Sequence, residues 1–186
     1  MIVISDSTPL ISLMKAGQLN VLKGLYGEIL IPGAVYSELT VNDRFADEME
    51  TIRQCAFIRV VSVKDRKTVN VLQRATGLDL GGSEAIVCAD DYQADVLLID
   101  EKAGRRVART MGLHIQGTIG VLLQAYDQRL LTAKEIDEAI EKLRNSKRHI
   151  SEEMFLYAKK YMVSKSMICL FGEQAEDQKR LLWEIS

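Results

Sequence analysis

Two short apolar segments of the chain each end directly in carboxylate side chains. Residues 2–5 are followed by Asp6, and residues 96–99 are followed by Asp100 and Glu101. Short apolar runs bounded by polar residues are typical of buried strands. Carboxylate oxygens without histidine or cysteine favour Mg²⁺ or Mn²⁺ over Zn²⁺. If the two strand ends meet, these acids are candidate ligands for a divalent cation.

Four basic residues follow the second acidic pair at helical intervals. They are Lys102, Arg105, Arg106 and Arg109, and their spacing places them on one face of a helix. Such a face either contacts the phosphates of a nucleic acid or is simply solvated, and the spacing alone does not choose between these interpretations. Its position directly after the acids favours a site for a metal ion and a polyanion.

The order of elements along the chain predicts how the two strand ends meet. Strands are predicted at residues 2–5, 28–31, 57–63, 96–99 and 113–115, with helices between them. This alternation is typical of a parallel sheet covered by helices. Ligands bind such sheets beyond the carboxyl ends of the strands, where the strand order reverses. Asp6 and Asp100 are neighbours if their strands flank that reversal.

Two helices contribute further acids near the same edge of the sheet. Glu38 falls in the second turn of one predicted helix. Glu84 falls in the first turn of another, for which Ser83 is the predicted N-cap. Thr8 is likewise the predicted N-cap of the helix after residues 2–6. Carboxylates in close proximity repel one another and raise one another's pKa, so a divalent cation would offset this repulsion.

Composition limits the class of protein. The chain has 186 residues, of which 47% are hydrophobic and 27% charged, as expected for one globular domain with a small appendage. The net charge of −2 means that any binding of nucleic acid has to come from local patches. Cys55, Cys88 and Cys169 lack zinc-ligand spacing, which favours reduced thiols in a cytoplasmic protein. No apolar run reaches the roughly 20 residues of a membrane helix.

Helices are also predicted for the last part of the chain. Thr132 and Glu135 have the spacing of a capping box that opens an amphipathic helix to about residue 145. Ser151 is the predicted cap of a second helix that reaches about residue 162. For residues 163–186, a terminal helix and a mobile tail are both consistent with the sequence, and Trp183 is a candidate anchor to the core or to a partner.

Two tyrosines recur on one side of that second helix. Tyr157 and Tyr161 are four residues apart, and Met154 lies one turn earlier. Aromatic and methionine side chains at this interval either pack against the core or provide a platform on which nucleobases stack. We interpret them as a packing stripe in preference to a stacking platform.

Four motifs in this order resemble the PIN-domain family of metal-dependent ribonucleases. The motifs are VISDSTPL at residues 3–10, IPGAVYSEL at 31–39, GGSEAI at 81–86 and LIDE at 98–101, followed by GTIG at 117–120. They are most similar to PIN-like predicted nucleic-acid-binding proteins, which often occur as toxin-like partners of small antitoxins. The resemblance predicts a PIN-like domain at residues 1–150 and a C-terminal helical extension or tail at 151–186.

The resemblance implies a fold, an activity and a set of site residues. The implied fold is a three-layer α/β/α sandwich around a five-stranded parallel sheet of order 3-2-1-4-5, with C-terminal helices added. The implied activity is that of an Mg²⁺- or Mn²⁺-dependent endoribonuclease that acts on RNA, forms a homodimer, binds a small antitoxin protein and has no membrane association. By position, the implied catalytic acids are Asp6, Glu38, Glu84 and Asp100, and the implied metal ligands are Asp6, Glu84 and Asp100. Auxiliary roles fall to Ser7, Thr8, Glu101 and Thr118, and nucleic-acid contacts fall to Lys102, Arg105, Arg106 and Arg109.

Departures from the family pattern leave an alternative open. Many relatives have Asp at the position of Glu84, and many have a second Asp two or three residues after Asp100, where this chain has none. A catalytically weak or inactive PIN-like module that binds nucleic acid within a protein complex is therefore the alternative. A phosphotransfer enzyme of the haloacid-dehalogenase type is disfavoured, because that chemistry needs a second Asp two residues after Asp6, where Thr8 stands.

Overall fold

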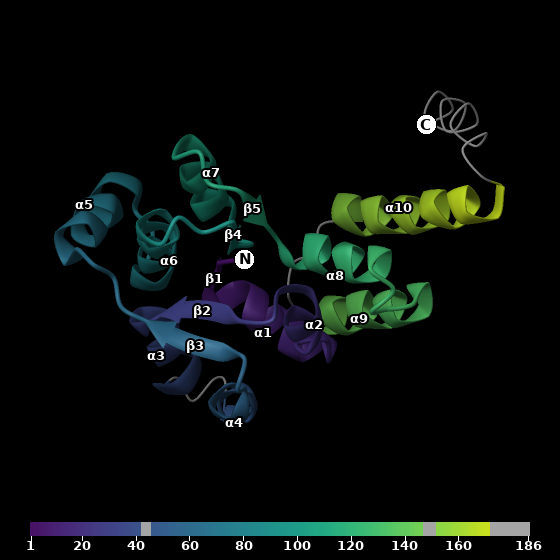
Figure 1. The fold of residues 1–186 in the computed structure, drawn as a ribbon, viewed down its shortest axis with the longest axis horizontal. Helices are drawn as coiled ribbons and strands as arrows, with labels where there is room; N and C mark the ends of the chain where they lie inside the picture. Colours follow the sequence, from purple (N-terminus) through teal and green to yellow (C-terminus); the bar gives the residue numbers. More distant parts are fainter. Residues whose placement is uncertain (42–45, 147–151, 172–186) are drawn as a thin grey trace.

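Five short parallel strands form one sheet at the centre of the molecule (Figure 1). The computed structural model describes residues 1–41, 46–146 and 152–171. The strands are β1 (Val3–Ser5), β2 (Ile29–Pro32), β3 (Ile58–Val61), β4 (Val96–Leu98) and β5 (Ile115–Gln116), in the spatial order β3-β2-β1-β4-β5. The strand order therefore reverses between β1 and β4, as predicted.

Helices cover both faces of the sheet, which confirms the predicted α/β/α sandwich. Within the described ranges they are α1 (Ser7–Ala16), α2 (Val21–Tyr26), α3 (Gly33–Val41), α4 (Ala46–Gln54), α5 (Arg66–Thr76), α6 (Leu80–Asp91), α7 (Lys102–Thr110), α8 (Thr118–Asp127), α9 (Ala133–Asn145) and α10 (Glu152–Phe171). Gly17 adopts a left-handed conformation with φ of 73° and ends α1, as glycine commonly does after the last turn of a helix.

Strand side chains alternate between two separate cores. Val3 and Leu98 face the core that is shared with α1, α8 and α9, whereas Ile4 and Leu97 face the core shared with α6 and α7. Because successive strand residues point to opposite faces, a short apolar run fills both cores at once. The parallel pairing of β1 with β4 brings their carboxyl ends to the same edge of the sheet.

Two helices begin earlier than the sequence predicts. Asp6 is the N-cap of α1 in place of Thr8, and Asp79 is the N-cap of α6 in place of Ser83. The Gly82 N–H donates a hydrogen bond of 2.7 Å to Asp79 Oδ1. An aspartate is a strong N-cap because its carboxylate satisfies a free N–H group of the first turn. This reason applies to Asp79, whereas Asp6 occupies the N-cap position of α1 without a side-chain cap hydrogen bond.

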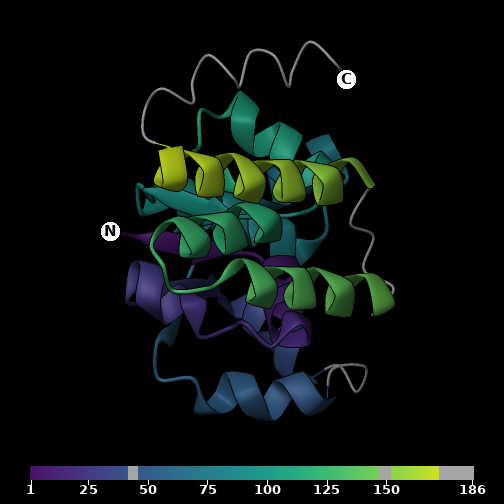
Figure 2. The same cartoon turned by 90° about the vertical axis from the view of Figure 1, so that its right-hand side faces the viewer.

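The C-terminal helices pack in a row with α8 between α9 and α10 (Figure 2). The capping box predicted at Thr132 and Glu135 is present at the start of α9. Helix α10 extends to Phe171, beyond the predicted end near residue 162. The predictions for Ser151 and for the tail with Trp183 lie outside the described residues. No described helix is long and apolar enough to cross a membrane.

Candidate metal and nucleic-acid site

The Asp6 carboxylate is buried at the carboxyl end of β1. Its residue is only 5% exposed, and its backbone N–H donates a hydrogen bond of 2.9 Å to the Leu98 carbonyl at the end of β4. Burial raises the pKa of Asp6 to about 7, and the nearby carboxylates of Asp79 and Glu38 add to this shift, whereas the N–H groups of Ser7 and Thr8 oppose it. The charged form of this group is therefore strongly disfavoured unless a cation compensates it.

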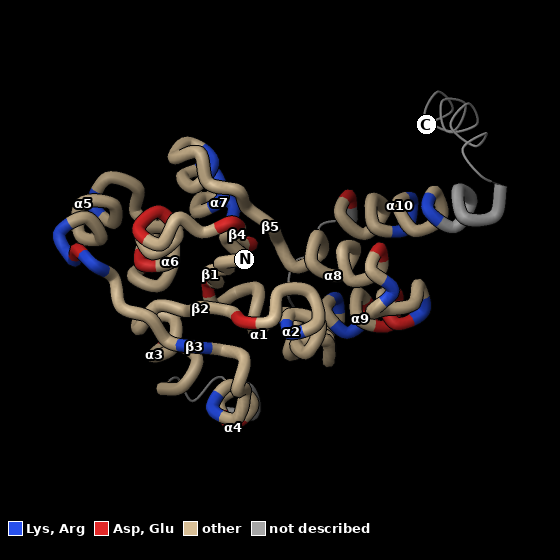
Figure 3. Tube along the Cα trace, viewed as in Figure 1, with Lys and Arg blue, Asp and Glu red and all other residues tan. Residues whose placement is uncertain are grey.

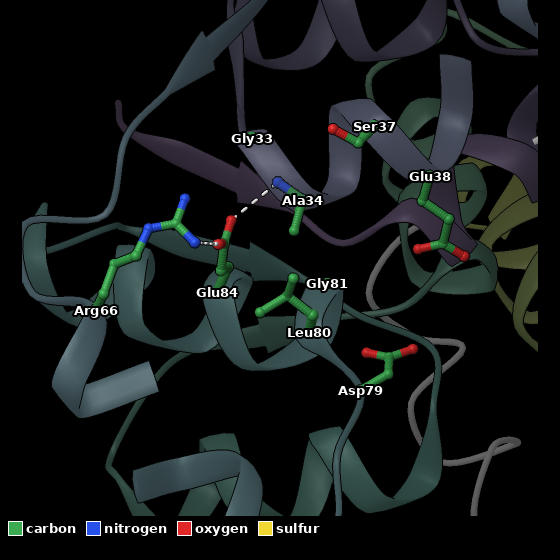
Figure 4. Close-up of a pocket in the computed structure, with 9 residues that line it drawn as sticks. All are labelled: Gly33, Ala34, Ser37, Glu38, Arg66, Asp79, Leu80, Gly81 and Glu84. Atoms are coloured by element: carbon green, nitrogen blue, oxygen red, sulfur yellow. Dashed lines mark hydrogen bonds and ion pairs between the residues drawn. The ribbon is translucent and has the colours of Figure 1, made fainter. Parts of the chain in front are cut away.

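Glu38 faces Asp6 across Gly81, a position without a side chain, and Asp79 is a further nearby carboxylate that raises the pKa of Asp6. A Cβ added at Gly81 would lie 3.1 Å from Glu38 Oε2 and 3.9 Å from Asp6 Oδ1, so glycine keeps the space between these carboxylates open. Figure 4 shows Glu38 and Asp79 with their carboxylates on the same side of the pocket. Asp79 is absent from the residues predicted from the sequence, although an aspartate three residues before Gly82 is a recognisable helix-start signal.

Glu84 lines the same cavity but is engaged elsewhere. The cavity has a volume of about 530 Å³ and is lined by Glu38, Asp79 and Glu84 among others. The Ala34 N–H donates a hydrogen bond of 2.9 Å to Glu84 Oε2, and Arg66 approaches Glu84 Oε1 at 3.6 Å (Figure 4). The guanidinium of Arg66 is largely exposed, so this ion pair adds little stability. Glu84 therefore ties α6 to the start of α3.

Asp100 is held by the start of α8. The Thr118 N–H donates to Asp100 Oδ1 at 2.8 Å, and the Thr118 hydroxyl donates to Asp100 Oδ2 at 2.5 Å. A carboxylate at the N-terminus of a helix is favoured by the free N–H groups and by the helix dipole. A Cβ at Gly117 would lie 2.7 Å from Asp100 Oδ1, so this close approach requires glycine. Thr118 thus holds Asp100 through two hydrogen bonds, and its auxiliary role in a site stays a prediction.

The basic residues of α7 divide into two pairs. Figure 3 shows the basic segment of α7 directly after the acidic end of β4. Lys102 and Arg105 line a second cavity of about 730 Å³ together with Asp100, whereas Arg106 and Arg109 line neither cavity and are exposed. Arg105 Nη1 donates a hydrogen bond of 2.8 Å to the Ile99 carbonyl. Burial lowers the pKa of Arg105, Arg109 adds to this shift, and the Asp100 carboxylate opposes it.

The four predicted acids surround the end of β1 and β4 without forming one compact cluster. The structure brings Asp6 and Glu38 together and adds Asp79, which also accepts the Gly82 N–H, while Glu84 and Asp100 accept hydrogen bonds from Ala34 and Thr118. Within the described ranges, no group of three His, Cys, Asp or Glu residues is close enough to hold a metal ion directly. Sequence order predicts that the acids share an edge, but backbone N–H groups decide which way each carboxylate turns.

The remaining auxiliary residues occupy different surroundings. Ser7 is buried beside Asp6, and Thr8 is half-buried and lines the cavity next to Asp100. Glu101 is exposed, occupies the N-cap position of α7 and lines the same cavity as Thr8. Any contribution of Thr8 and Glu101 is therefore confined to the Asp100 side of the site.

Comparison with known families agrees with this architecture. A family model described as a PIN domain matches residues 2–162. Because the match covers most of the chain, the chain belongs to the PIN-domain family. The PIN domain is a nuclease fold, and its members generally use divalent metals. No curated protein matches the chain. The predicted division at residue 150 stays a prediction, and the family match runs through it into α10.

The donors of the Asp6 cluster, defined as Asp6, Glu38 and Asp79, fit a hydrated divalent cation. All are hard carboxylate oxygens, and Gly81 leaves space between two of them. Mg²⁺ usually keeps several waters and is bound through only one or two protein carboxylates, so a compact group of three donors is not required. The raised pKa of Asp6 also agrees with a position that a cation would complete.

Proposed function

We propose that this PIN-domain protein is a metal-dependent endoribonuclease that hydrolyses RNA phosphodiesters. The observation that carries the proposal is the buried Asp6 carboxylate, whose pKa is raised to about 7 by burial and by two neighbouring acids. Among the described residues, no Lys or Arg forms an ion pair with Asp6. A hydrated Mg²⁺ or Mn²⁺ ion, bound directly by one or two of Asp6, Glu38 and Asp79 and through water by the rest, would compensate these charges.

Two sets of residues have different roles in phosphodiester hydrolysis, cation binding and phosphate binding. When bound, a divalent cation lowers the pKa of a coordinated water and neutralises charge on the phosphodiester. Asp6 and Glu38 supply the negative charge that holds the cation at the edge of the sheet. Lys102 and Arg105 are placed to hold flanking phosphates, which fixes the register of the strand without reading its sequence.

The catalytic and ligand roles predicted for Glu84 and Asp100 are part of this proposal. Each lines one of the two cavities. Each carboxylate already accepts a hydrogen bond, from Ala34 or from Thr118, and a cation would bind the lone pairs that remain. In its present position Asp100 instead holds the start of α8 and shapes the cavity beside it.

The proposal extends to a toxin-type role in the cytoplasm, with a homodimer as the assembly and a small antitoxin protein as the inhibitory partner. The resemblance to toxin-like PIN proteins supports this role. Expression of the wild-type chain in a bacterial host should then arrest growth, and expression of Asp6→Asn at the same level should not. Normal growth at full wild-type expression would count against the toxin role and would leave the nuclease proposal in place.

The nuclease proposal is tested with a mixed RNA pool incubated with Mg²⁺, Mn²⁺ or EDTA. Asp6→Asn and Asp100→Asn should each lower metal-dependent cleavage by about 100-fold or more, the size of effect seen when one charge-stabilising group is removed from an active site. Asp90→Asn is the matched control, because Asp90 is an exposed acid at the far end of α6, and it should cleave at the wild-type rate. Wild-type cleavage by folded Asp6→Asn would contradict the proposal.

The second candidate function is a PIN-like module that binds nucleic acid without turnover. The engagement of Glu84 by Ala34 and of Asp100 by Thr118 favours it, because two of the four predicted acids are already satisfied by protein donors. RNA binding in EDTA together with an absence of cleavage in Mn²⁺ would select this function. Cleavage that EDTA abolishes would exclude it.

A further inference from the structure

The cavity beside Asp100 has a second wall that comes from α10. Its lining includes Asp100, Glu101, Lys102 and Arg105 on one side and Met154 and Tyr157 of α10 on the other. Tyr157 is 51% exposed and Met154 is 41% exposed. The predicted packing stripe is therefore wrong for Tyr157 and Met154, and only Tyr161 packs against the core. A large aromatic ring thus lies exposed at a charged cavity.

Tyr157 sits on a helix that the rest of the fold holds in place. Ala158 and Met162 of α10 are buried in the core, and the guanidinium of Arg144 lies 4.7 Å from the ring centre of Phe155. The Tyr161 hydroxyl donates to a carboxylate oxygen of Asp127 at the end of α8. Ordering Tyr157 on binding would therefore be less unfavourable than ordering a side chain on a loose segment.

The floor of the cavity is also fixed by hydrogen bonds. Gln116 Nε2 donates to Gln124 Oε1 at 2.9 Å, and the Tyr26 hydroxyl lies 3.0 Å from Gln116 Oε1. Burial raises the pKa of Tyr26 to about 12, whereas the hydrogen bond to Gln116 opposes the shift, so the hydroxyl stays a donor near neutral pH. These hydrogen bonds fix the side chain of Gln116, which lines the same cavity as Tyr157.

The two walls have the chemistry of a site for single-stranded nucleic acid. Such sites combine cations that track the backbone with aromatic rings on which bases stack. Here Lys102 and Arg105 supply the cations and Tyr157 supplies the ring. A base inside a duplex is stacked on its neighbours and does not offer its face to a protein ring, so this arrangement favours an unpaired base.

We propose that Tyr157 and Met154 form a base-binding subsite for single-stranded RNA next to Asp100, with Lys102 holding the adjacent phosphate. The proposal takes its substrate class from the proposed function. It assigns to the C-terminal helix α10 a direct part in RNA binding, in which Tyr157 is a binding residue that contacts the base and not the scissile phosphate.

The test measures RNA affinity in EDTA, so that cleavage plays no part. The probes are a fluorescein-labelled oligoadenylate and the same strand with abasic units in place of the adenosines, and the readout is fluorescence anisotropy. Loss of one stacked base weakens binding by about 5- to 100-fold. Tyr157→Ala should therefore weaken binding of oligoadenylate by that factor and leave binding of the abasic strand unchanged. Tyr157→Phe should restore wild-type affinity.

Two further variants separate stacking from charge and from stability. Lys102→Ala should weaken both strands equally and reduce the salt dependence of binding, because it removes one phosphate contact. Leu156→Ala is the matched control, since Leu156 is a similarly exposed apolar residue of α10 that does not line the cavity, and its affinity should be unchanged. Melting temperatures of all variants show whether the fold is kept.

Three results would overturn the inference: no binding of oligoadenylate by the wild-type protein, unchanged affinity in folded Tyr157→Ala, or equal losses for the adenosine and abasic strands. Failure of the base-binding subsite is distinguishable from failure of the proposed nuclease function. Metal-dependent cleavage with unchanged affinity in Tyr157→Ala removes the subsite and keeps the nuclease. Binding that depends on Tyr157 without any cleavage removes the nuclease and keeps the subsite.

Discussion

Asp6 and Asp100 stand at the carboxyl ends of adjacent strands but have opposite electrostatic surroundings. Asp6 is buried beside Glu38 and Asp79, and its pKa is raised to about 7. Asp100 accepts two hydrogen bonds from Thr118 at the N-terminus of α8. The same sequence signature is an acid after an apolar strand. At Asp6 it produces a carboxylate whose charged form is disfavoured, and at Asp100 it produces a carboxylate that Thr118 hydrogen-bonds.

This difference separates the part of the site that needs a ligand from the part that builds the scaffold. A carboxylate whose charged form is disfavoured destabilises the fold when it ionises, and a bound cation offsets this penalty. A carboxylate that clamps a helix start contributes to folding instead. Substitutions at each acid and at the glycine beside it test this difference between Asp6 and Asp100.

The largest expected effect on stability is at Asp6, in metal-free protein. The unfolded-state pKa is near 3.8 and the folded-state pKa is about 7, so the folded state binds the proton more tightly and stability falls as pH rises through this interval. Asp6→Asn removes this loss and should raise the free energy of unfolding by about 4 kcal/mol at pH 8, with little gain at pH 4, because each pKa unit corresponds to about 1.4 kcal/mol. Urea denaturation in EDTA measures both free energies of unfolding. A lower stability of Asp6→Asn than of wild type at pH 8 would contradict the proposed difference between Asp6 and Asp100.

Asp100 should respond with the opposite sign. Asp100→Asn weakens two hydrogen bonds to a charged acceptor and should lower the free energy of unfolding by about 1–2 kcal/mol. Thr118→Ala should have a similar effect, and the double variant should lose less than the sum, since both substitutions remove the same contact. Additive losses in this double-mutant cycle would show that the clamp contributes nothing measurable.

The smallest expected effect is at the two glycines, Gly117 and Gly81, when each is replaced by alanine. In Gly117→Ala the new Cβ would lie 2.7 Å from Asp100 Oδ1 and 2.9 Å from Arg105 Nη1, so we expect destabilisation of about 1 kcal/mol. In Gly81→Ala the nearest atom is the end of the Glu38 side chain, which can move, and alanine favours the helix by up to about 1 kcal/mol. Gly81→Ala should therefore keep stability but weaken Mn²⁺ binding. Equal destabilisation of both variants would remove the distinction.

The fold and the shared edge of the acids follow from local sequence patterns. Apolar runs at residues 2–5 and 96–99 and the alternation with helices are enough to predict a parallel sheet, whereas the strand order that reverses beside Asp6 and Asp100 is predicted by the family resemblance. Gly17 and the capping box of Thr132 are recognisable because each acts through its nearest neighbours in sequence. Features of this kind are predictable because they need no knowledge of tertiary contacts.

The direction of each carboxylate depends on contacts between distant segments. Glu84 turns towards the N–H of Ala34, which lies 50 positions away in sequence, and no local pattern predicts that hydrogen bond. Asp79 escapes prediction for a different reason, because Ser83 is also an acceptable cap and sits closer to the apolar part of the helix. The exposure of Tyr157 depends on how α10 packs on α8, which helical spacing does not determine.

A thermal melt with and without Mn²⁺ tests directly whether the protein has a cation site centred on Asp6. A ligand at 100 times its Kd stabilises the folded state by about 2.7 kcal/mol, which is readily detected. We expect Mn²⁺ to raise the Tm of the wild-type protein and of the Asp90→Asn control and to leave the Tm of Asp6→Asn unchanged. An unchanged wild-type Tm, or an equal rise in Asp6→Asn, would contradict a cation site centred on Asp6.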